Sequence, residues 1–373
     1  MHISSNTTGM QAGLSVAMDK DAREHCVVVI KGTFRCDDGD EPRLAETQRP
    51  LVFADEHHGD PGATSIRYEC DFALGKPRAE VLVHGHAIAR RGRPVESMLV
   101  RLELPERSKE LLVTGDRYWD QGLLGLSSTQ PKPFNRMPMV FEHAFGGSDY
   151  SHPEARHQGT ELRNPVGVGF CKNPSASDAL GVLLPNIEDP RQRIERWRDT
   201  PTPVGFGSIG RNWQPRIGYA GTYDERWLHD VCPFLPADFE PRYFQSAPED
   251  QQVPELKGGQ VLRCIGMTET GTWTVTLPCM QVPVSFHFRD RRLEVESRLD
   301  TVLLDCDAQE AVVIWRASCP LGKKLINLRE VRVGAPPPSS SFGPVSYRKG
   351  KPYFQGLGAF VAWTRRKQRG GSP

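Results

Sequence analysis

Glycine and proline constrain this chain more than any other feature of its sequence. Its 35 glycines and 31 prolines make up nearly a fifth of the 373 residues, whereas average usage is about 12%. They are spread along the chain without a fixed period, which excludes collagen-like and repeat architectures. Because both residues favour turns and interrupt helices, we expect short strands joined by many turns.

Apolar patterns predict where those strands lie. Residues 26–34 are rich in β-branched side chains, which favour a strand. Residues 79–89 alternate small or apolar side chains with Glu80, His84 and His86, as a half-buried strand does. Similar patterns predict strands at 98–104, 110–114, 272–277, 284–288, 293–295, 302–304 and 311–317. Short helices are predicted at 190–198, after a proline, and at 224–229.

These segments predict a mainly β protein. Its two β-rich halves should pack as sandwich-like layers, with a long Gly/Pro-rich irregular middle and few short helices. We expect a flexible N-terminal arm at 1–24, a β-rich domain at 25–335 and a Pro/Ser linker with a basic C-terminal tail at 336–373. Inside the domain, strand-rich segments at 25–114 and 251–335 flank motif-dense loops at 115–250.

Charge and cysteine usage exclude several classes of protein. The formal net charge is +1, which does not favour nucleic acid as a partner. The nine cysteines include no CxxC pair, so they indicate neither a disulfide framework nor a zinc ribbon. Free buried thiols, no apolar run of about 18 residues and no signal-like start in 1–24 favour a cytoplasmic protein without a membrane partner.

Short patterns that suggest catalysis or metal binding each have a simpler structural explanation. His84 and His86 would lie on one strand face and, with the Glu142-His143 pair, could hold a metal, but no further ligand-like spacing accompanies them. Ser208 lacks the spacing of a nucleophile elbow, and Cys171 lacks an obvious histidine partner. We therefore expect no metal, no cofactor and no catalytic residue.

The middle of the chain carries many short motifs whose order is informative. They are GDEP at 39–42, RP at 49–50, KP at 76–77, GDRYW at 115–119, FNRMPM at 134–139, FEHAFGG at 141–147, NPVGVGF at 164–170, LPN at 184–186, PVGFG at 203–207, WQPR at 213–216, AGTYD-x-x-W at 220–227, LPADF at 235–239 and AP-x-DQ at 247–251. With this order, roughly residues 25–320 resemble a bacterial domain-of-unknown-function family of type VI secretion system adaptors, or chaperones.

The resemblance implies a function in protein binding. Such an adaptor binds a cognate secreted effector, or a PAAR-like or spike protein, and helps load it onto the secretion spike. It implies no cofactor and no catalytic residue. Two alternatives stay open: a hydrolase that uses a carboxylate pair such as Asp116 and Glu142, and a structural component of the spike.

The same motifs contain charged and aromatic side chains that can hold Gly/Pro-rich loops in place, since such loops lose much backbone entropy on folding. The partner-binding candidates are Asp116, Arg117, Trp119, Glu142, Phe145, Trp213, Arg216, Tyr223 and Trp227. We expect them to pack together into one rigid surface that receives the partner. The alternative is that they are scaffold, because buried aromatic residues usually belong to a core.

Overall fold

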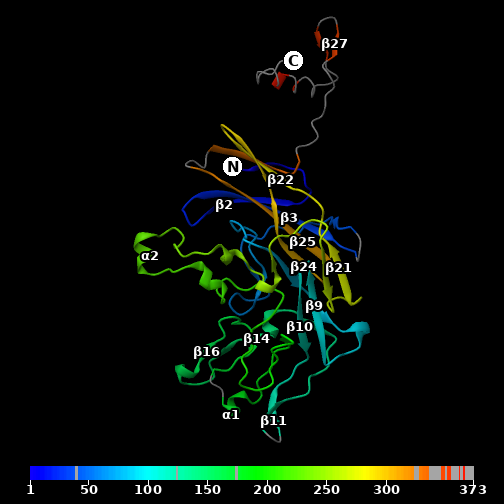
Figure 1. Ribbon diagram of the computed structural model, residues 1–373, viewed down its shortest axis with the longest axis vertical. Coiled ribbons are helices and arrows are strands. Elements are labelled where there is room, and N and C mark those ends of the chain that lie inside the picture. The colour runs from blue at the N-terminus through cyan, green and yellow to red at the C-terminus, as the bar shows by residue number, and fades with distance from the viewer. Residues whose placement is uncertain are drawn as a thin grey trace.

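The computed structural model describes residues 1–37, 41–122, 125–172, 175–322, 327–335, 346–348 and 351–353, with Val361, Thr364 and Arg365. Within these residues the protein is mainly β, with several sheets and few short helices, which confirms the predicted fold class. In Figure 1 the molecule is elongated, with long strands through its middle and α2 (Glu225–Asp230) projecting from one side.

A seven-stranded sheet joins the two ends of the described domain. Its spatial order is β19 (Gln252–Val253), β7 (Ala79–His84), β24 (Arg298–Asp305), β25 (Glu310–Pro320), β3 (Glu24–Arg35) and β2 (Gln11–Met18), with β4 (Arg43–Leu44) beside β3. β25 pairs antiparallel with β3 along its whole length, and β24 pairs parallel with β7. β3 and β7, both from the first quarter of the chain, thus each pair with a strand from its last quarter.

Two smaller sheets complete the main layers. One has the order β18 (Ile187–Glu188), β10 (Arg107–Thr114), β9 (Ser97–Leu104), β20 (Val261–Ile265), β21 (Thr272–Thr276), and the other has β1 (Ile3–Asn6), β26 (Leu328–Val333), β22 (Pro283–Phe288), β23 (Arg292–Glu296). Alternate residues of the strands, such as Val28 and Ile30 of β3 and Phe286 of β22, share one large apolar core with the seven-stranded sheet. Period-two alternation therefore places the core between the sheets.

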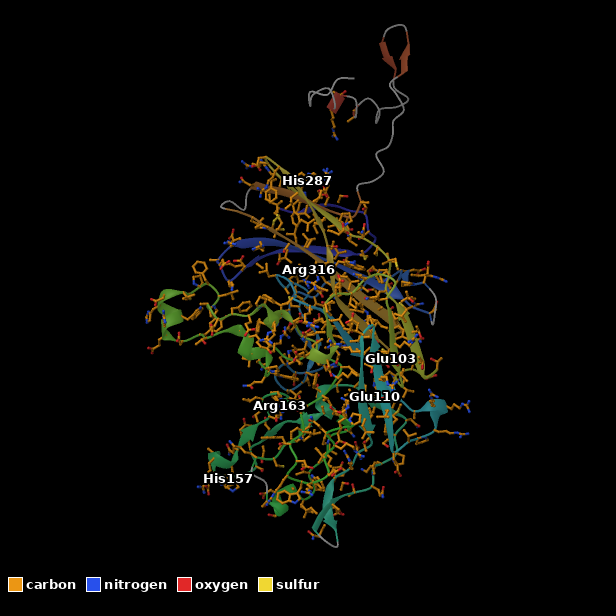
Figure 2. All side chains as sticks on the ribbon, viewed as in Figure 1. Glu103, Glu110, His157, Arg163, His287 and Arg316 are labelled. Atoms are coloured by element: carbon orange, nitrogen blue, oxygen red, sulfur yellow. The ribbon has the colours of Figure 1, made fainter. Side chains whose placement is uncertain are left out.

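The other face of the seven-stranded sheet is covered by loops. Val27, Val29 and Ile314 form a small apolar cluster there. Buried ionic groups lie beside that cluster: Arg316 pairs with Asp300 and also donates to the Asp71 carbonyl. Arg316 lies in the middle of the molecule in Figure 2. Buried charges persist in a fold only when they are paired. The bond to the Asp71 carbonyl, with the Lys31–Asp71 ion pair, ties the loop around Asp71 to the sheet.

The motif-dense middle contains only short elements. Its short strands include β11 (Trp119–Gly122), β12 (Gly125–Ser128), β13 (Arg136–Pro138), β14 (Phe145–Gly146), β15 (Ser148–Asp149), β16 (Gly159–Thr160) and β17 (Val168–Gly169). Three further short strands precede this segment: β8 (His86–Ile88) pairs with β13, and β5 (Glu56–His57) pairs with β6 (Ile66–Tyr68). The helices are α1 (Ala176–Ala179), α2, and the 3-10 turns η1 (Arg90–Gly92), η2 (Phe141–His143), η3 (Ala155–His157), η4 (Arg216–Ala220), η5 (Pro241–Phe244) and η6 (Glu249–Gln251).

Two sequence predictions about the N-terminal half are wrong. Residues 1–24 are not an arm without structure, because they contain β1 and β2, and all eight residues of β2 pair with β3. Met10, between the two strands, is buried against Gly32, where a side chain would collide with its sulfur. The predicted strand at 79–89 is interrupted at Gly85, whose φ of 136° ends β7 and turns β8 toward β13.

The predicted helix at 190–198 does not form either. Carboxylates take the backbone N–H groups that a helix would use: Glu188 accepts from Ile194, and Asp199 accepts from Glu195 and Arg196. Side-chain acceptors of this kind compete with helical hydrogen bonds. The helix predicted at 224–229 is confirmed as α2. The linker prediction at 336–345 lies outside the described residues, and β27 (Ser346–Arg348) and β28 (Lys351–Tyr353) form a pair beyond it.

Candidate functional site

A buried carboxylate fastens the end of the motif-dense segment to the central sheet. Glu80 of β7 is fully buried, and Lys76 donates to it. It also accepts from the side chain of Gln245, from the backbone and hydroxyl of Ser246 and from the backbone of Ala247. Because so many donors converge on one carboxylate, residues 245–247 have a single position on the sheet.

A second ionic cluster contains one of the partner-binding candidates. Arg216 is buried and pairs with Glu69, while it also donates to the backbone carbonyls of Tyr243 and Ile209. Burial opposes ionisation of Glu69, but Arg216 and the nearby Lys76 and Arg211 outweigh it and lower the pKa of Glu69 to about 2. Arg216 therefore joins three segments of the chain and acts as scaffold.

Three further candidates are buried in the lower part of the molecule. Arg117 pairs with Glu188 of β18, and both side chains are buried. Trp119 and Phe145 belong to one small apolar cluster, which also contains Leu184. These side chains are closed to a partner in this structure and hold the loops of 115–200 together. For these three residues the structure therefore favours a scaffold role over a role in binding a partner.

Trp213, Glu142 and Asp116 also make internal contacts. Trp213 is buried with its ring at 90° to that of Phe141, 5.4 Å between centroids. Glu142 accepts from the backbone and the hydroxyl of Ser65 at 2.8 and 2.7 Å. Asp116 accepts from the Asn186 side chain at 3.1 Å. Neither carboxylate of the alternative hydrolase lines the cavity around His84, the one around Arg316 or the groove beside Lys109.

Two candidates are on the surface, in a projecting segment that we name the α2 lobe (residues 215–244). Tyr223 is 53% exposed and packs edge-on against Trp227 at 4.6 Å. Asp224 caps α2 by accepting from the Trp227 backbone, and the Trp227 indole donates to the Phe234 carbonyl. Figure 1 shows the lobe standing out from the sheets. Its exposed large apolar side chains are Ile217, Tyr223, Leu228 and Phe234.

A groove of about 560 Å³ lies at the base of the lobe. Its apolar wall contains Pro203, Val204, Ile209, Pro215 and Pro248, and we name it the proline-lined groove. Lys109 of β10 sets its floor by donating to the Gly205 carbonyl, to Asp250 and to Gln251 at 2.8–2.9 Å. Burial lowers the pKa of Lys109, opposed by the charge of Asp250.

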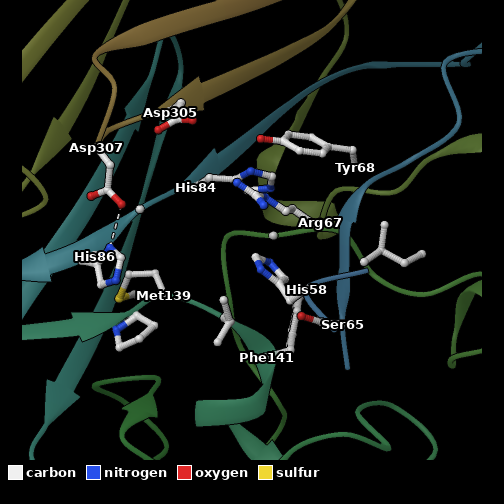
Figure 3. A pocket seen from close by; sticks show the side chains of 15 residues that line it. His58, Ser65, Arg67, Tyr68, His84, His86, Met139, Phe141, Asp305 and Asp307 are labelled. Atoms are coloured by element: carbon white, nitrogen blue, oxygen red, sulfur yellow. Dashed lines mark hydrogen bonds and ion pairs between the residues drawn. The ribbon is translucent and has the colours of Figure 1, made fainter. Parts of the chain in front are cut away.

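The two histidines that the sequence singled out line another, smaller cavity. His84 packs against the rings of Tyr68 and His58, whereas His86 bonds to Asp307 at 2.7 Å (Figure 3). No group of three or more His, Cys, Asp or Glu side chains among the described residues is placed to hold a metal ion. The cysteines of the described chain are all free, and burial raises the pKa of the Cys171 thiol.

Sequence reasoning missed the residues that hold these sites in place. Lys109 follows the pattern of an exposed strand position, since its neighbours in sequence are charged or polar. Glu80 likewise alternates with apolar residues, as an outward-facing residue does. Burial of these charges has no clear local signal, because most of their partners, such as Gln251 for Lys109 and Ser246 for Glu80, are more than 140 residues away.

Comparison with known proteins yields one match. The model of a family described as "Uncharacterized protein conserved in bacteria (DUF2169)" matches residues 21–316, which is most of the chain. No curated protein and no solved structure matches. In the part of the chain that the structure describes, no helix is long and apolar enough to cross a membrane.

Proposed function

The chain belongs to the conserved bacterial family DUF2169, and from this premise we propose that it is an adaptor, or chaperone, of a type VI secretion system. In this proposal it binds a cognate effector or PAAR-like tip domain in the cytoplasm and helps load it onto the spike. The α2 lobe carries the proposal: it presents four large apolar side chains to solvent on a segment that the buried Arg216–Glu69 ion pair anchors at its base.

The physical argument rests on how protein interfaces obtain their affinity. A few aromatic and large aliphatic side chains on a rigid base supply most binding energy, because little conformational entropy is lost when they are covered. Tyr223 and Leu228 are such side chains. Arg216 fixes the lobe at its base through Glu69 and the Tyr243 carbonyl. The lobe is thus preorganised for a partner surface.

The proline-lined groove extends this surface toward the sheets. Pro215 belongs to both the lobe and the groove wall, and Ile209 of that wall accepts a hydrogen bond from Arg216 at the base of the lobe, so one partner can contact both features. A groove with apolar walls suits an extended segment of a partner chain. In the proposal, the lobe contacts the folded part of the tip domain and the groove receives its adjoining segment.

Leu228→Lys tests the lobe, with Leu99→Lys as its matched control. Both leucines are about half exposed, at 57% and 51%, but Leu99 lies on β9, outside the lobe. We expect Leu228→Lys to weaken capture of the effector or PAAR-like protein encoded beside its gene at least about tenfold, or about 1.4 kcal/mol. Leu99→Lys should bind like the unmodified protein, and both should keep its melting temperature.

The adaptor proposal fails at this surface if Leu228→Lys captures the partner as well as the control does. It also fails if neither the variants nor the unmodified protein captures the effector or the PAAR-like protein encoded beside its gene. Combining Leu228→Lys with Tyr223→Ala guards against a single tolerated change, since Tyr223 precedes α2, Leu228 lies within it, and both are exposed.

A further inference from the structure

The histidine cavity, which is distinct from the lobe and the groove, has the features of a small binding site. It has a volume of about 250 Å³ and lies where β6, the end of β7 and residues 138–141 meet. Its apolar side is formed by Ile66, Met139 and Phe141. Typical pockets for drug-sized ligands begin at about 300 Å³, so this cavity suits a smaller molecule or a single residue.

Hydrogen-bond donors without partners converge on this cavity. His84 makes no side-chain hydrogen bond within the described residues, and its buried Nε2 is unpartnered. His58 and Arg67 likewise have no hydrogen bond or ion pair there, and the Arg67 guanidinium lies 5.1 Å from the Tyr68 ring centre. Figure 3 shows these four side chains pointing toward one another. A buried polar atom without a partner calls for a ligand or water.

The acidic side chains of the cavity are already engaged. Asp305 accepts from Arg49 at 2.8 Å, and Asp307 accepts from His86 and Arg136 at 2.7 and 2.8 Å. They therefore do not neutralise Arg67. Glu142, which lies near His58, directs both of its oxygens to Ser65. Arg67 is the one arginine or lysine on the lining of this cavity, and within the described residues it has no ion pair.

The two imidazoles are neutral near pH 7. Burial, with Arg67 and His58 nearby, lowers the pKa of His84 to about 3, against a smaller opposing effect of Asp305. Burial also lowers the pKa of His58, with Arg67 adding to the effect and Glu142 opposing it. A neutral imidazole has one N–H to donate. Tyr68, whose hydroxyl oxygen accepts from Arg49 at 3.3 Å, keeps its own proton to donate.

We propose that the histidine cavity binds a carboxylate group, which Arg67 pairs with and His84, His58 and Tyr68 hydrogen-bond. Arginine matches a carboxylate with two parallel hydrogen bonds. One unpaired cation suits a monoanion, whereas a phosphate dianion would bring an uncompensated charge close to Asp305 and Asp307. Met139 and Phe141 receive the apolar part of the ligand. The carboxylate belongs either to a small free acid or to the C-terminus of a peptide chain.

Titration with N-acetyl-L-leucine, followed by the NMR signals of the His58 and His84 rings, tests this proposal. N-acetyl-L-leucinamide, which has the same side chain but no negative charge, is the control ligand. We expect the acid to shift both signals saturably and the amide to leave them unchanged. Arg67→Gln, at an exposed residue, should weaken binding of the acid at least about tenfold without a change in melting temperature.

A cavity-filling variant gives an independent test that does not remove a polar group. Gly207 lines the cavity, its φ is not positive, and an added Cβ would meet no atom within 4 Å. Gly207→Leu should therefore fold and exclude the acid. Gly75→Leu is its matched control, because Gly75 also has open space at its Cβ but does not line the cavity.

Two further arms decide the source of the carboxylate. A pentapeptide that ends in leucine is tested with a free and with an amidated C-terminus. If the cavity takes a chain terminus, the free peptide binds and the amidated one does not. If acetyl-leucine binds but neither peptide does, the ligand is a small acid. Equal binding of acid and amide, unchanged binding by Gly207→Leu or Arg67→Gln, or tighter binding of inorganic phosphate would each overturn the proposal. Leu228→Lys should leave acid binding unchanged, so this site and the adaptor surface stand or fall separately.

Discussion

At the scale of single residues, the loops of this protein are held by buried ionic groups as well as by apolar contacts. Glu80, Arg117 and Arg216 are each almost fully buried and each has a charged partner. Removing one member of such a pair leaves an unpaired charge in a medium of low polarity. The same chemistry explains why charged motif residues that look suited to a partner are enclosed in the scaffold.

Replacing Glu80 tests how much this network contributes. Glu80→Gln removes the nearer of the two carboxylates that pair with buried Lys76, the other being Glu69 at 3.7 Å, and it disturbs the bonds from the backbone of Ser246 and Ala247. We expect a loss of about 3–5 kcal/mol in the free energy of unfolding, measured in urea. Glu255→Gln, at the exposed ion pair with Lys257, should change it by less than about 1 kcal/mol. Similar losses for the two variants would contradict the argument.

His84 makes stability depend on pH. Its folded pKa of about 3 is below the ordinary value of 6.5, so the unfolded chain binds the proton more readily. The contribution of the neutral, buried His84 ring to the free energy of unfolding is therefore complete above pH 6.5. It is lost as the pH falls toward 3, by at most about 1.4 kcal/mol per pH unit. Between pH 7 and 5, His84→Gln should lose less stability in urea than the unmodified protein. Parallel losses would rule out this role of His84.

At the scale of elements, the first strands of the chain are part of the fold. β2 (Gln11–Met18) is an edge strand whose neighbour β3 carries buried side chains on both faces. Its own residues are mostly half-buried or exposed, which is why the sequence resembles a polar arm. By contrast, the sequence predicts the helix of the α2 lobe, because its capping residue Asp224 is a local signal for a helix start.

Met10→Ala tests whether the N-terminal strands contribute to stability. Met10 is 3% exposed and packs into the main core, so the truncation should cost about 2–5 kcal/mol of unfolding free energy. Val16→Ala, on the exposed face of β2, should cost less than about 1 kcal/mol. Urea unfolding of both variants measures the difference. A Met10→Ala protein as stable as Val16→Ala would mean that the strands are only loosely attached.

At the scale of the whole molecule, strands from distant parts of the chain share each large sheet. β3 pairs with β25 across most of the sequence, and β9 pairs with β20 across the whole motif-dense middle. The sandwich-like layers are therefore not independent folding units, since each layer needs strands from both halves. The long irregular middle is an insertion between paired strands, and it carries the α2 lobe, the proline-lined groove and one wall of the histidine cavity.

The sequence by itself determined the fold class, most strand positions and the family. Alternation at 98–104 and 284–288 is a local property that a pleated strand imposes on its own residues, and structure confirms both segments as β9 and β22. The pairing of β9 with β10 is also a local property, because the two strands follow one another in the chain and form a hairpin.

Only the tertiary structure decided which strands pair, which charges are buried and where the cavities lie. Glu80 meets its donors at residues 245–247, and Arg67 meets His84 beside a gap that Gly207 leaves open. These encounters depend on the path of the whole chain, and no nearby residue signals them. Local periodicity specifies an element and its apolar face, whereas a site made of distant segments exists only once the sheets have brought them together.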